Sequence, residues 1–543
     1  MGAIGSKKRE YKIGEKSSDS ITDKKVIETV VCRDDDLEDG KMAEFEINDT
    51  NKVLLVKENG IYSAFGTKCP HYGAPLKNGV LINGKIRCPW HGACFNSKTG
   101  DIEDFPGLDS LPCYQVSVEN GDVKVKAEVS ALKNHKRVKE MSKYSHINPS
   151  TFVIIGGGAA AQVCTETLRQ EGFNGKIILI TKEKHLPYDR PKLSKALDTK
   201  ASDLYLRNAD FFKKADVSVM LETEVTSIDT SEKWVACNNG KLKVKYESLM
   251  IATGGQPIRM QIPGSDLKNI YYLRTPEDGK SIVKASAGKS VVIIGTSFIG
   301  MEVASYLMNK ATSIHVIGRS PVPFAKVFGL DICNRIKQLF EEKGVVFHFE
   351  KDVVEFAGED GLLTGIKFSS GECIRADVCV IGIGVKPATD YLKSSGISMN
   401  EKGLVMVDEF LKTNIDGIYA CGDIVEFPLA TYGNVRVNIS HWQIAQAHGR
   451  VAALNMVGKV TALQSVPFFW CAMFGKNFRY AGYAENYDEV IIDGDVEKLE
   501  FVAYFISNSE VVAVCTANRD PEAAKFASRI CQGEKILRNE IHT

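Results

Sequence analysis

The sequence predicts a multidomain chain that opens with an all-β domain and continues into two α/β domains with glycine-rich turns. Two observations carry this prediction. Short alternating stretches typical of strands, each with an Asn-Gly turn, fill residues 26–127. A strand, a glycine turn and a helix follow one another from residue 151, and the same pattern begins again at residue 290. The 543 residues leave room for three or four domains, each with its own core.

Composition excludes several classes of protein. The formal net charge is zero and 25% of the residues are charged, so nothing favours a nucleic-acid-binding protein. Apolar runs such as residues 291–295 are far too short to span a bilayer. The 14 cysteines contain no CxxC or CxxxxC pair, which argues against a disulfide scaffold and against a redox-active dithiol. A reducing compartment is therefore expected.

Residues 1–25 are polar, and we expect them to form a disordered tail. The tail begins with M-G-x-x-x-S, the acceptor pattern for myristate on Gly2, and the basic run Lys7-Lys8-Arg9 would supply a second membrane signal. A plain disordered start is the alternative. A mitochondrial presequence fits less well because acidic residues such as Glu10 interrupt the basic ones. These features predict a cytoplasmic location, with membrane association if Gly2 is myristoylated.

Two short segments of the all-β domain carry paired metal-ligand residues. Cys69 and His71 lie two positions apart, and 16 residues separate His71 from the second pair, Cys88 and His91. Two thiolates and two imidazoles would suit a tetrahedral zinc ion. They would also suit a [2Fe–2S] cluster in which the cysteines hold one iron and the histidines hold the other.

The residues around these ligands favour the cluster. Pro70 and Pro89 stiffen the two segments, and Gly73 and Gly92 follow them, as expected of two rigid loops that face each other. The pattern resembles the Rieske [2Fe–2S] fold, and residues 93–107 resemble the part of that fold that closes over the cluster. We therefore predict a Rieske cluster at Cys69, His71, Cys88 and His91.

The resemblance also implies a reduction potential. High-potential Rieske proteins have a disulfide between the two loops and hydroxyl donors to the cluster sulfurs. Here the disulfide positions are Ala74 and Trp90, and the donor positions are Ala93 and Phe95. Fewer donors stabilise the reduced cluster less. We expect a potential near the low end of the Rieske range, roughly −150 mV, as in a ferredoxin-like carrier.

The first glycine-rich turn follows the strand at residue 151 and is predicted to bind a dinucleotide. Its pattern G-x-G-x-x-A comprises Gly156, Gly157, Gly158, Ala159, Ala160 and Ala161. Glycines allow the tight turn and bring backbone N–H groups close to a pyrophosphate at the helix N-terminus.

Three later segments strengthen this motif. Residues 185–197, 250–255 and 417–423 follow it in order, and together they resemble the FAD-dependent pyridine-nucleotide oxidoreductases, in the branch of the ferredoxin reductases and apoptosis-inducing factor. The resemblance implies an FAD-binding domain made of residues 151–271 and 397–458.

The same resemblance assigns individual contacts to FAD. It implies that Arg190 meets the pyrophosphate, that Asp423 meets the ribitol, that Lys195 lies near flavin N5 and that Val225 is a further contact. The chain differs from this family at the acidic residue that is expected to contact the adenosine ribose of FAD. Thr181 and Lys182 stand in its place, and Glu183 comes slightly late.

The second glycine-rich turn contains Gly295, Ser297 and Gly300, with serine in the middle glycine position. It is predicted to open an NAD(P)-binding domain over residues 272–396. Glu302 follows on the helix, and the resemblance implies that it pairs with Lys195 beside the contact of nicotinamide and flavin. We predict Lys195 and Glu302 as the catalytic residues. The alternative is that Glu302 is an ordinary surface residue of the helix with no catalytic role.

The electron donor is predicted to be NADPH in preference to NADH. NAD-dependent enzymes usually place an acid where Gly318 stands, to accept from the ribose 2′-OH, and here Arg319 follows instead. Arg319 is also compatible with a solvated turn. A further family segment, residues 380–389, supplies Gly382 and Gly384.

From residue 459 the chain resembles the α+β C-terminal domain of the reductases, which we assign to residues 459–543. Residues 466–482 would set Trp470 against the flavin, and Trp442 lies in the segment expected to point a helix at the flavin pyrimidine. Cys471 and the two residues after it replace a Ser-Asp-Gln run of the ferredoxin reductases.

The domain order, a Rieske domain over 26–127, a basic linker over 128–150 and the reductase domains, is similar to that of the Rieske-containing apoptosis-inducing-factor-like proteins (the apoptosis-inducing factor 3 type). This resemblance covers about residues 26–540. The family is described as mitochondrial and linked to cell death, so a mitochondrial location is the alternative to a cytoplasmic one.

These features predict an NAD(P)H:acceptor oxidoreductase. Electrons would pass from NAD(P)H through FAD to the tethered cluster and on to an unknown acceptor protein, because no oxygenase domain is found in the sequence. The alternative is a redox-sensing or cell-death signalling protein that uses the same cofactors to control partner binding.

Overall fold

The computed structural model describes residues 25–541. The predicted acylation site at Gly2 and the basic residues 7–9 lie outside the described residues, as does nearly all of the expected tail. Among residues 25–541, no helix is long and apolar enough to cross a membrane.

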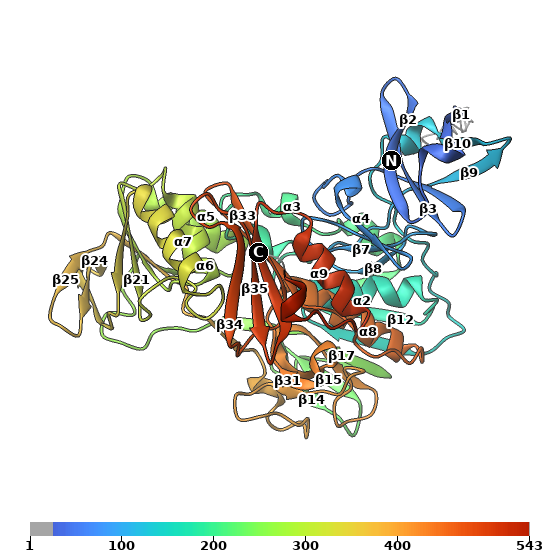
Figure 1. Ribbon diagram of the computed structural model, residues 1–543. Coiled ribbons are helices and arrows are strands. Elements are labelled where there is room, and N and C mark those ends of the chain that lie inside the picture. The colour runs from blue at the N-terminus through green and yellow to red at the C-terminus, as the bar shows by residue number, and fades with distance from the viewer. Residues whose placement is uncertain (1–24, 542–543) are drawn as a thin grey trace, which may run out of the picture.

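The chain forms four domains in the predicted order, which confirms the multidomain fold class. Figure 1 shows the N-terminal all-β domain in blue at one end of the molecule and the second α/β domain in yellow-green at the other. The first α/β domain and the C-terminal domain, in red, lie between them.

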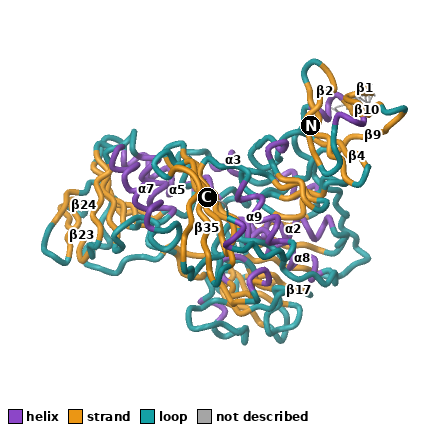
Figure 2. The backbone as a smooth tube through the Cα atoms, viewed as in Figure 1, coloured by secondary structure: helices purple, strands orange, loops and turns teal. Residues whose placement is uncertain are grey.

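The all-β domain contains two antiparallel sheets and is mostly strand and loop (Figure 2). The larger sheet has the order β1-β10-β9-β4-β3-β2. Its strands are β1 (Val26–Arg33), β2 (Lys41–Asn48), β3 (Asn51–Glu58), β4 (Ile61–Phe65), β9 (Cys113–Glu119) and β10 (Asp122–Glu128). The smaller sheet has the strands β5 (Val80–Ile82), β6 (Lys85–Arg87), β7 (Cys94–Asn96) and β8 (Ile102–Asp104).

The two cysteine–histidine segments are loops of this domain. The first loop follows β4, and the second connects β6 to β7. Gly73 and Gly92 have φ values of +80°, which a residue with a side chain adopts only under strain. The glycines noted in the sequence therefore allow both loops to turn back sharply after their ligands.

The first α/β domain is built on a parallel sheet of order β13-β12-β11-β17-β29. Its strands are β11 (Thr151–Ile155), β12 (Lys176–Ile180), β13 (Val217–Met220), β17 (Ser248–Ile251) and β29 (Ile418–Ala420). The strands are almost entirely apolar, as expected of a sheet buried on both faces. The main helices are α2 (Ala159–Gln170) and α8 (Trp442–Met456), and the short ones are α3 (Ala201–Leu204) and α4 (Ala209–Lys214).

The second α/β domain repeats this plan, with a parallel sheet of order β19-β26-β20-β21-β22. Its strands are β19 (Ile270–Tyr272), β20 (Ser290–Ile294), β21 (Ser313–Gly318), β22 (Val345–Phe349) and β26 (Val378–Ile381). Its helices are α5 (Pro276–Ser286), α6 (Phe298–Leu307) and α7 (Leu330–Glu342). Because β19 already belongs to this sheet, the chain enters the domain slightly before the predicted boundary at residue 272.

Smaller sheets cover and connect the two α/β domains. One contains β14 (Val225–Asp229), β15 (Trp234–Cys237) and β16 (Leu242–Lys245), and another contains β23 (Val353–Glu359), β24 (Leu362–Phe368) and β25 (Cys373–Arg375). The connecting pair is β18 (Gly255–Pro257) with β27 (Val385–Pro387). A third sheet contains β28 (Val405–Met406), β30 (Val425–Leu429) and β31 (Val435–Val437).

The C-terminal domain is α+β, with an antiparallel sheet of order β32-β33-β36-β35-β34 and, among its residues up to 541, one α-helix. Its elements are β32 (Phe468–Met473), β33 (Lys476–Gly482), β34 (Glu489–Asp495), β35 (Glu500–Ser507), β36 (Glu510–Ala517) and α9 (Glu522–Cys531). Strand β32 carries the tryptophan that the sequence placed at the flavin.

The basic segment 128–150 is bound along its length to its neighbours. It begins with α1 (Val129–Leu132), and Arg137 exchanges backbone hydrogen bonds of 2.8 and 2.9 Å with Ser110 of the all-β domain. Further on, the Ser142 N–H donates to the carbonyl of Arg169 in α2 at 2.9 Å. The linker therefore fixes the all-β domain to the first α/β domain instead of leaving it on a loose tether.

Buried ion pairs also hold these two domains together. Arg207 of the first α/β domain donates to Asp109 of the all-β domain at 2.7 Å and to Glu166 of α2 at 2.8 Å. All three side chains are at most 11% exposed. Nearby, the Gln446 side chain of α8 donates to the carbonyl of Gly107 at 3.1 Å. The docking is thus specific and mostly polar.

Candidate active site

The four predicted metal ligands come together at one end of the all-β domain. The Nδ1 atoms of His71 and His91 lie 3.1 Å apart, and the thiols of Cys69 and Cys88 are hydrogen-bonded to each other. Backbone N–H groups of Tyr72 and Trp90 point at the two sulfurs. The donors therefore form a sulfur pair and a nitrogen pair, the arrangement that two irons with different ligands require.

The protonation of these residues also suits a metal cluster. Burial lowers the pKa of His71 to about 3 and holds the pKa of His91 well below its usual value. Both imidazoles are therefore neutral and have a lone pair for a metal. Although burial opposes it, the hydrogen bond from Cys69 lowers the pKa of Cys88 and favours a thiolate there.

Trp470 of β32 lies directly against the two histidines. Its ring centroid is 4.4 Å from that of His91 and 5.6 Å from that of His71. The approach of the two domains is close, because a Cβ on Gly92 would come within 2.8 Å of the Phe468 ring. Trp470 and Phe468 also line a cavity of the first α/β domain, so one aromatic wall separates the metal site from that cavity.

The cavity measures about 380 Å³ and lies at the carboxyl ends of the parallel strands. Five of the six motif residues line it, namely Gly156, Gly157, Gly158, Ala159 and Ala160. Gly156 has φ of +128°, and a Cβ there would lie 2.1 Å from the Ala252 carbonyl oxygen. Ala161 does not face the cavity and is fully buried in the packing of α2.

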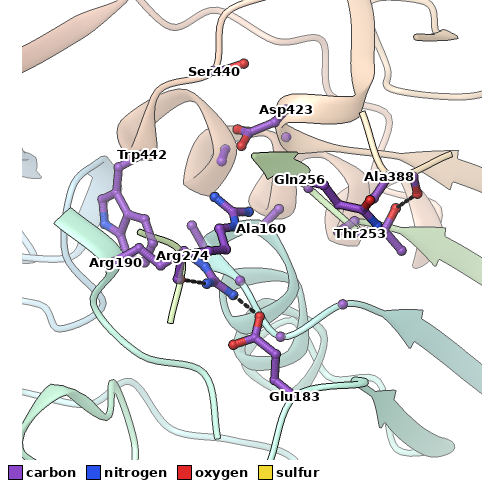
Figure 3. A pocket seen from close by; sticks show the side chains of 18 of the residues that line it. Ala160, Glu183, Arg190, Thr253, Gln256, Arg274, Ala388, Asp423, Ser440 and Trp442 are labelled. Atoms are coloured by element: carbon purple, nitrogen blue, oxygen red, sulfur yellow. Dashed lines mark hydrogen bonds and ion pairs between the residues drawn. The ribbon is translucent and has the colours of Figure 1, made fainter. Parts of the chain in front are cut away.

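Charged side chains line the same cavity, as Figure 3 shows for Arg190, Arg274, Asp423 and Glu183. Arg190 forms an ion pair of 2.5 Å with Glu183. Burial raises the pKa of Asp423, while Arg274 and Arg190 act against this shift. Two arginines and the N-terminus of α2 suit a pyrophosphate, so these residues fit FAD.

The sequence places Glu183 slightly late for the adenosine ribose, and its side chain lines the cavity beside Thr181 and Lys182. Arg274 was not predicted at all, since it follows β19 and no glycine or motif marks it. Val225, Asp423 and Trp442 line the cavity as the resemblance implied.

Lys195 and Glu302 meet at the edge of the cavity. Their charged groups lie 2.8 Å apart, and Glu302 is only 4% exposed although it belongs to a helix of the other α/β domain. Ser194 also donates to the Glu302 carboxylate. The positive charge of Lys195 additionally contributes to the low pKa of His91, so the lysine lies near the metal ligands as well.

A second cavity opens at the glycine turn of the second α/β domain and is lined by Gly295, Ser297, Arg319 and Gly384. Gly295 repeats the geometry of Gly156, with φ of +121° and its Cβ position 2.2 Å from the Gly382 carbonyl oxygen. The remaining motif glycine has a packing role.

That glycine is Gly300, which does not line the second cavity. A Cβ on Gly300 would lie 2.1 Å from the Gly295 carbonyl oxygen, so only glycine lets α6 pack closely on the turn.

Comparison with known proteins agrees with this arrangement. The family described as pyridine nucleotide-disulphide oxidoreductase matches residues 150–449, the Rieske [2Fe–2S] domain matches residues 28–115 and the reductase C-terminal domain matches residues 468–541. The Rieske match selects the [2Fe–2S] cluster over a zinc ion for the four ligands.

Relatives extend over nearly the whole chain. Human apoptosis-inducing factor 3 is 46% identical over 522 residues, which cover 95% of this chain and 86% of the human protein. The mouse protein of the same name is 44% identical, with the same coverage. A rubredoxin-NAD(+) reductase of Pseudomonas putida is 31% identical over 68% of this chain and 95% of its own length.

Solved structures match the reductase part. Putidaredoxin reductase, in its covalent complex with putidaredoxin, has a TM-score of 0.69 and 26% identity over 72% of this chain and 95% of its own. A ferredoxin reductase from Rhodopseudomonas palustris has a TM-score of 0.68 and 27% identity over 72% and 97%.

The cofactors follow from these matches. FAD and NAD(P)H belong to the two α/β domains and a [2Fe–2S] cluster belongs to the loops, so the chain is a ferredoxin-reductase-like flavoprotein oxidoreductase that carries its own Rieske domain. With this architecture and 46% identity over nearly its full length, the chain belongs to the pyridine nucleotide-disulphide oxidoreductases, as a Rieske-containing protein of the apoptosis-inducing factor 3 type.

Proposed function

We propose that the chain passes electrons from NADPH through FAD to its own Rieske cluster and then to an external one-electron acceptor protein. The observation that supports this most strongly is the position of Trp470. Its ring lines the FAD cavity and lies 4.4 Å from the ring of the cluster ligand His91. No other protein is needed to bring the two cofactor sites into contact.

The residues around the cavity support each step. When bound, FAD takes up two electrons with a hydride and releases them singly, and the cluster carries one at a time. Lys195 holds a positive charge at the edge of the cavity, where it stabilises the negative charge that the hydride brings. Glu302 fixes the lysine at 2.8 Å, and the aromatic wall with Trp470 leads to the cluster ligands.

The preference for NADPH rests on the second cavity. An acid in place of Gly318 has no room, because even a Cβ there would lie 2.5 Å from the Thr296 side chain. Arg319 is exposed, and it lines the cavity together with Lys326 and Lys351. Arg319 and Lys326 suit a 2′-phosphate better than a free ribose hydroxyl, whereas Lys351 already pairs with Glu372 at 3.0 Å.

Removing the cluster tests the relay. We expect Cys88→Ser to abolish NADPH-dependent reduction of a haem-protein acceptor, because the electron then has no site beyond the flavin. Flavin reduction by NADPH should keep its rate, since Cys88 lies outside the FAD cavity. The two rates are measured by anaerobic stopped flow, at the flavin and at the haem.

Cys94→Ser is the matched control, because Cys94 is equally buried in the same domain and is not a ligand. Loss of both activities in Cys88→Ser, or of neither, would contradict the relay. Acceptor reduction that survives without a cluster would favour the sensing role, in which the cluster controls partner binding instead of transferring electrons to the acceptor.

Myristoylation of Gly2, and with it attachment of a cytoplasmic protein to membranes, is also proposed from the sequence. Metabolic labelling with a myristate analogue in cells tests it, with Gly2→Ala as the control. Absence of label, together with import into mitochondria, would favour the alternative location.

A further inference from the structure

The contact with Trp470 does not cover the whole surface of the metal loops. Cys69, Cys88 and both prolines are buried, whereas His71 and Tyr72 are partly exposed and Gly73 is exposed. In the second loop His91 and Trp90 are also partly exposed, but Gly92 is buried and Trp90 packs on the core. The tip of the first loop is therefore more exposed than the tip of the second.

Tyr72 is held firmly at this place. Its ring stacks on that of His71, with centroids 3.8 Å apart and an angle of 15° between the planes. Its hydroxyl donates to Asp189 of the first α/β domain at 2.6 Å. A partly exposed aromatic ring thus lies in contact with a cluster ligand and is fixed from both sides.

Three lysines lie in or near the first metal loop, and we call Lys68, Lys136 and Lys192 the basic rim. The Lys192 ammonium lies 4.9 Å from the centre of the Tyr72 ring. Lys136 and Lys192 both act electrostatically on His71. Lys68 directly precedes the ligand Cys69 and is exposed.

The acids near the rim are turned inward. Asp109 and Asp189, which lie 3.9 Å from Lys136 and 3.6 Å from Lys192, have side chains only 6% and 9% exposed. The two lysine side chains are 58% and 40% exposed. What an approaching protein meets at Tyr72 is therefore positive charge, and part of it comes from the basic linker, which has no role in the relay itself.

We propose that the basic rim around Tyr72 is the docking surface through which the reduced cluster passes its electron to an acidic one-electron carrier protein. This inference rests on the proposed relay and names its last step. The [2Fe–2S] cluster loses one electron, and the iron of the acceptor gains it, with no bond made or broken. A carrier with carboxylates around its own redox centre fits the rim, and a carrier with a basic surface is repelled.

The surface around the cluster ligands has two separate sides, one in contact with Trp470 and one at Tyr72, and this explains why an acceptor would dock at Tyr72. Trp470 occupies the side of the histidines that faces FAD, so an acceptor cannot use that side while the domains are docked. Entry at Trp470 and exit at Tyr72 let the electron pass through without separating the domains. Positive charge at the exit raises the rate of encounter with an acidic partner by about ten- to a thousandfold, and salt weakens the effect.

The test uses cytochrome b5, an acidic haem protein, as the probe with the full-length holoprotein. We expect Lys68→Glu with Lys136→Glu to lower kcat/KM for cytochrome b5 roughly tenfold and to flatten its dependence on ionic strength. Reduction of basic cytochrome c should stay equal or become faster. The EPR signal of the cluster and the rate of flavin reduction by NADPH should not change.

The matched control is Lys280→Glu with Lys284→Glu, which changes the net charge equally on exposed residues of α5 in the second α/β domain (Figure 1). If Lys68→Glu, which lies next to Cys69, alters the EPR signal of the cluster, the single variant Lys136→Glu replaces the double variant. Equal rates for the rim and control variants, or equal loss with both cytochromes, would overturn the docking surface.

Failure of the relay can be told apart from failure of the rim. If NADPH does not reduce the cluster, the proposed function fails. The cluster can then be reduced with dithionite and mixed with oxidised cytochrome b5 in a stopped-flow instrument. A rim variant that reoxidises as fast as the wild type in that mixing experiment contradicts the docking surface alone.

Discussion

Trp470 is the side chain at which the two cofactor sites meet, and its removal tests their coupling. We expect Trp470→Ala to slow reduction of the cluster by the flavin between roughly tenfold and hundredfold, because the close contact with His91 is lost. Trp470→Phe should recover most of the rate. Stopped-flow absorbance follows flavin and cluster separately, and a cluster that reduces at the wild-type rate in Trp470→Ala would remove this residue from the path.

Lys195 acts in an earlier step of the proposed relay, the reduction of the flavin by NADPH. We expect Lys195→Ala to slow flavin reduction by NADPH roughly hundredfold, because the cavity then lacks the charge that stabilises the incoming hydride. Lys192→Ala is the control, since this lysine lies three residues away and does not line the cavity. An unchanged rate of flavin bleaching in Lys195→Ala would contradict the assignment.

The single residues differ in how far the sequence could predict them. Gly156 and Gly295 were predictable because their positive φ and close carbonyl contacts leave glycine as the residue that fits. Whether Glu183 reaches the cavity could not be predicted, because strand spacing does not show how far a flexible side chain extends. The pairing of Tyr72 with Asp189 had no signal, since the two residues belong to different domains and neither lies in a distinctive spacing.

At the scale of the elements, docking of the Rieske domain depends on the buried triad Asp109, Arg207 and Glu166. Removing the charge of Asp109 leaves Arg207 with one partner, a loss of about 3 kcal/mol for a buried pair. We expect Asp109→Asn to slow electron transfer from flavin to cluster while flavin reduction by NADPH keeps its rate.

Asp122→Asn is the control for this variant, because Asp122 also pairs with an arginine, at 2.6 Å, but that arginine is Arg33 of its own domain, on the exposed outer sheet. Equal cluster reduction in wild type and Asp109→Asn would show that the triad does not position the domain.

The elements themselves were largely predictable, and their mutual arrangement was not. Alternating strands with Asn-Gly turns and two glycine turns before helices are local patterns, so the order of the first three domains followed from them. The C-terminal domain was assigned from its resemblance to the reductases. The linker shows the limit. Its basic composition predicted a linker, and it did not show that backbone groups of Arg137 and Ser142 bind both neighbouring domains. Backbone hydrogen bonds of this kind leave no trace in residue type.

At the scale of the whole molecule, one chain places a hydride-accepting cavity and a one-electron centre on either side of a single aromatic wall. The second α/β domain contributes Glu302 to the flavin side and the C-terminal domain contributes Trp470 to the cluster side. In the proposed relay, both electron-transfer steps before the acceptor take place within this one folded chain.

The most direct test of the relay is an anaerobic EPR titration of the purified protein with NADPH and, separately, with NADH. The account predicts a Rieske-type signal at less than one equivalent of NADPH, and a weaker response to NADH because Arg319 and its neighbours suit the 2′-phosphate. A flavin that bleaches with either nucleotide while the cluster signal appears only with dithionite would contradict the relay.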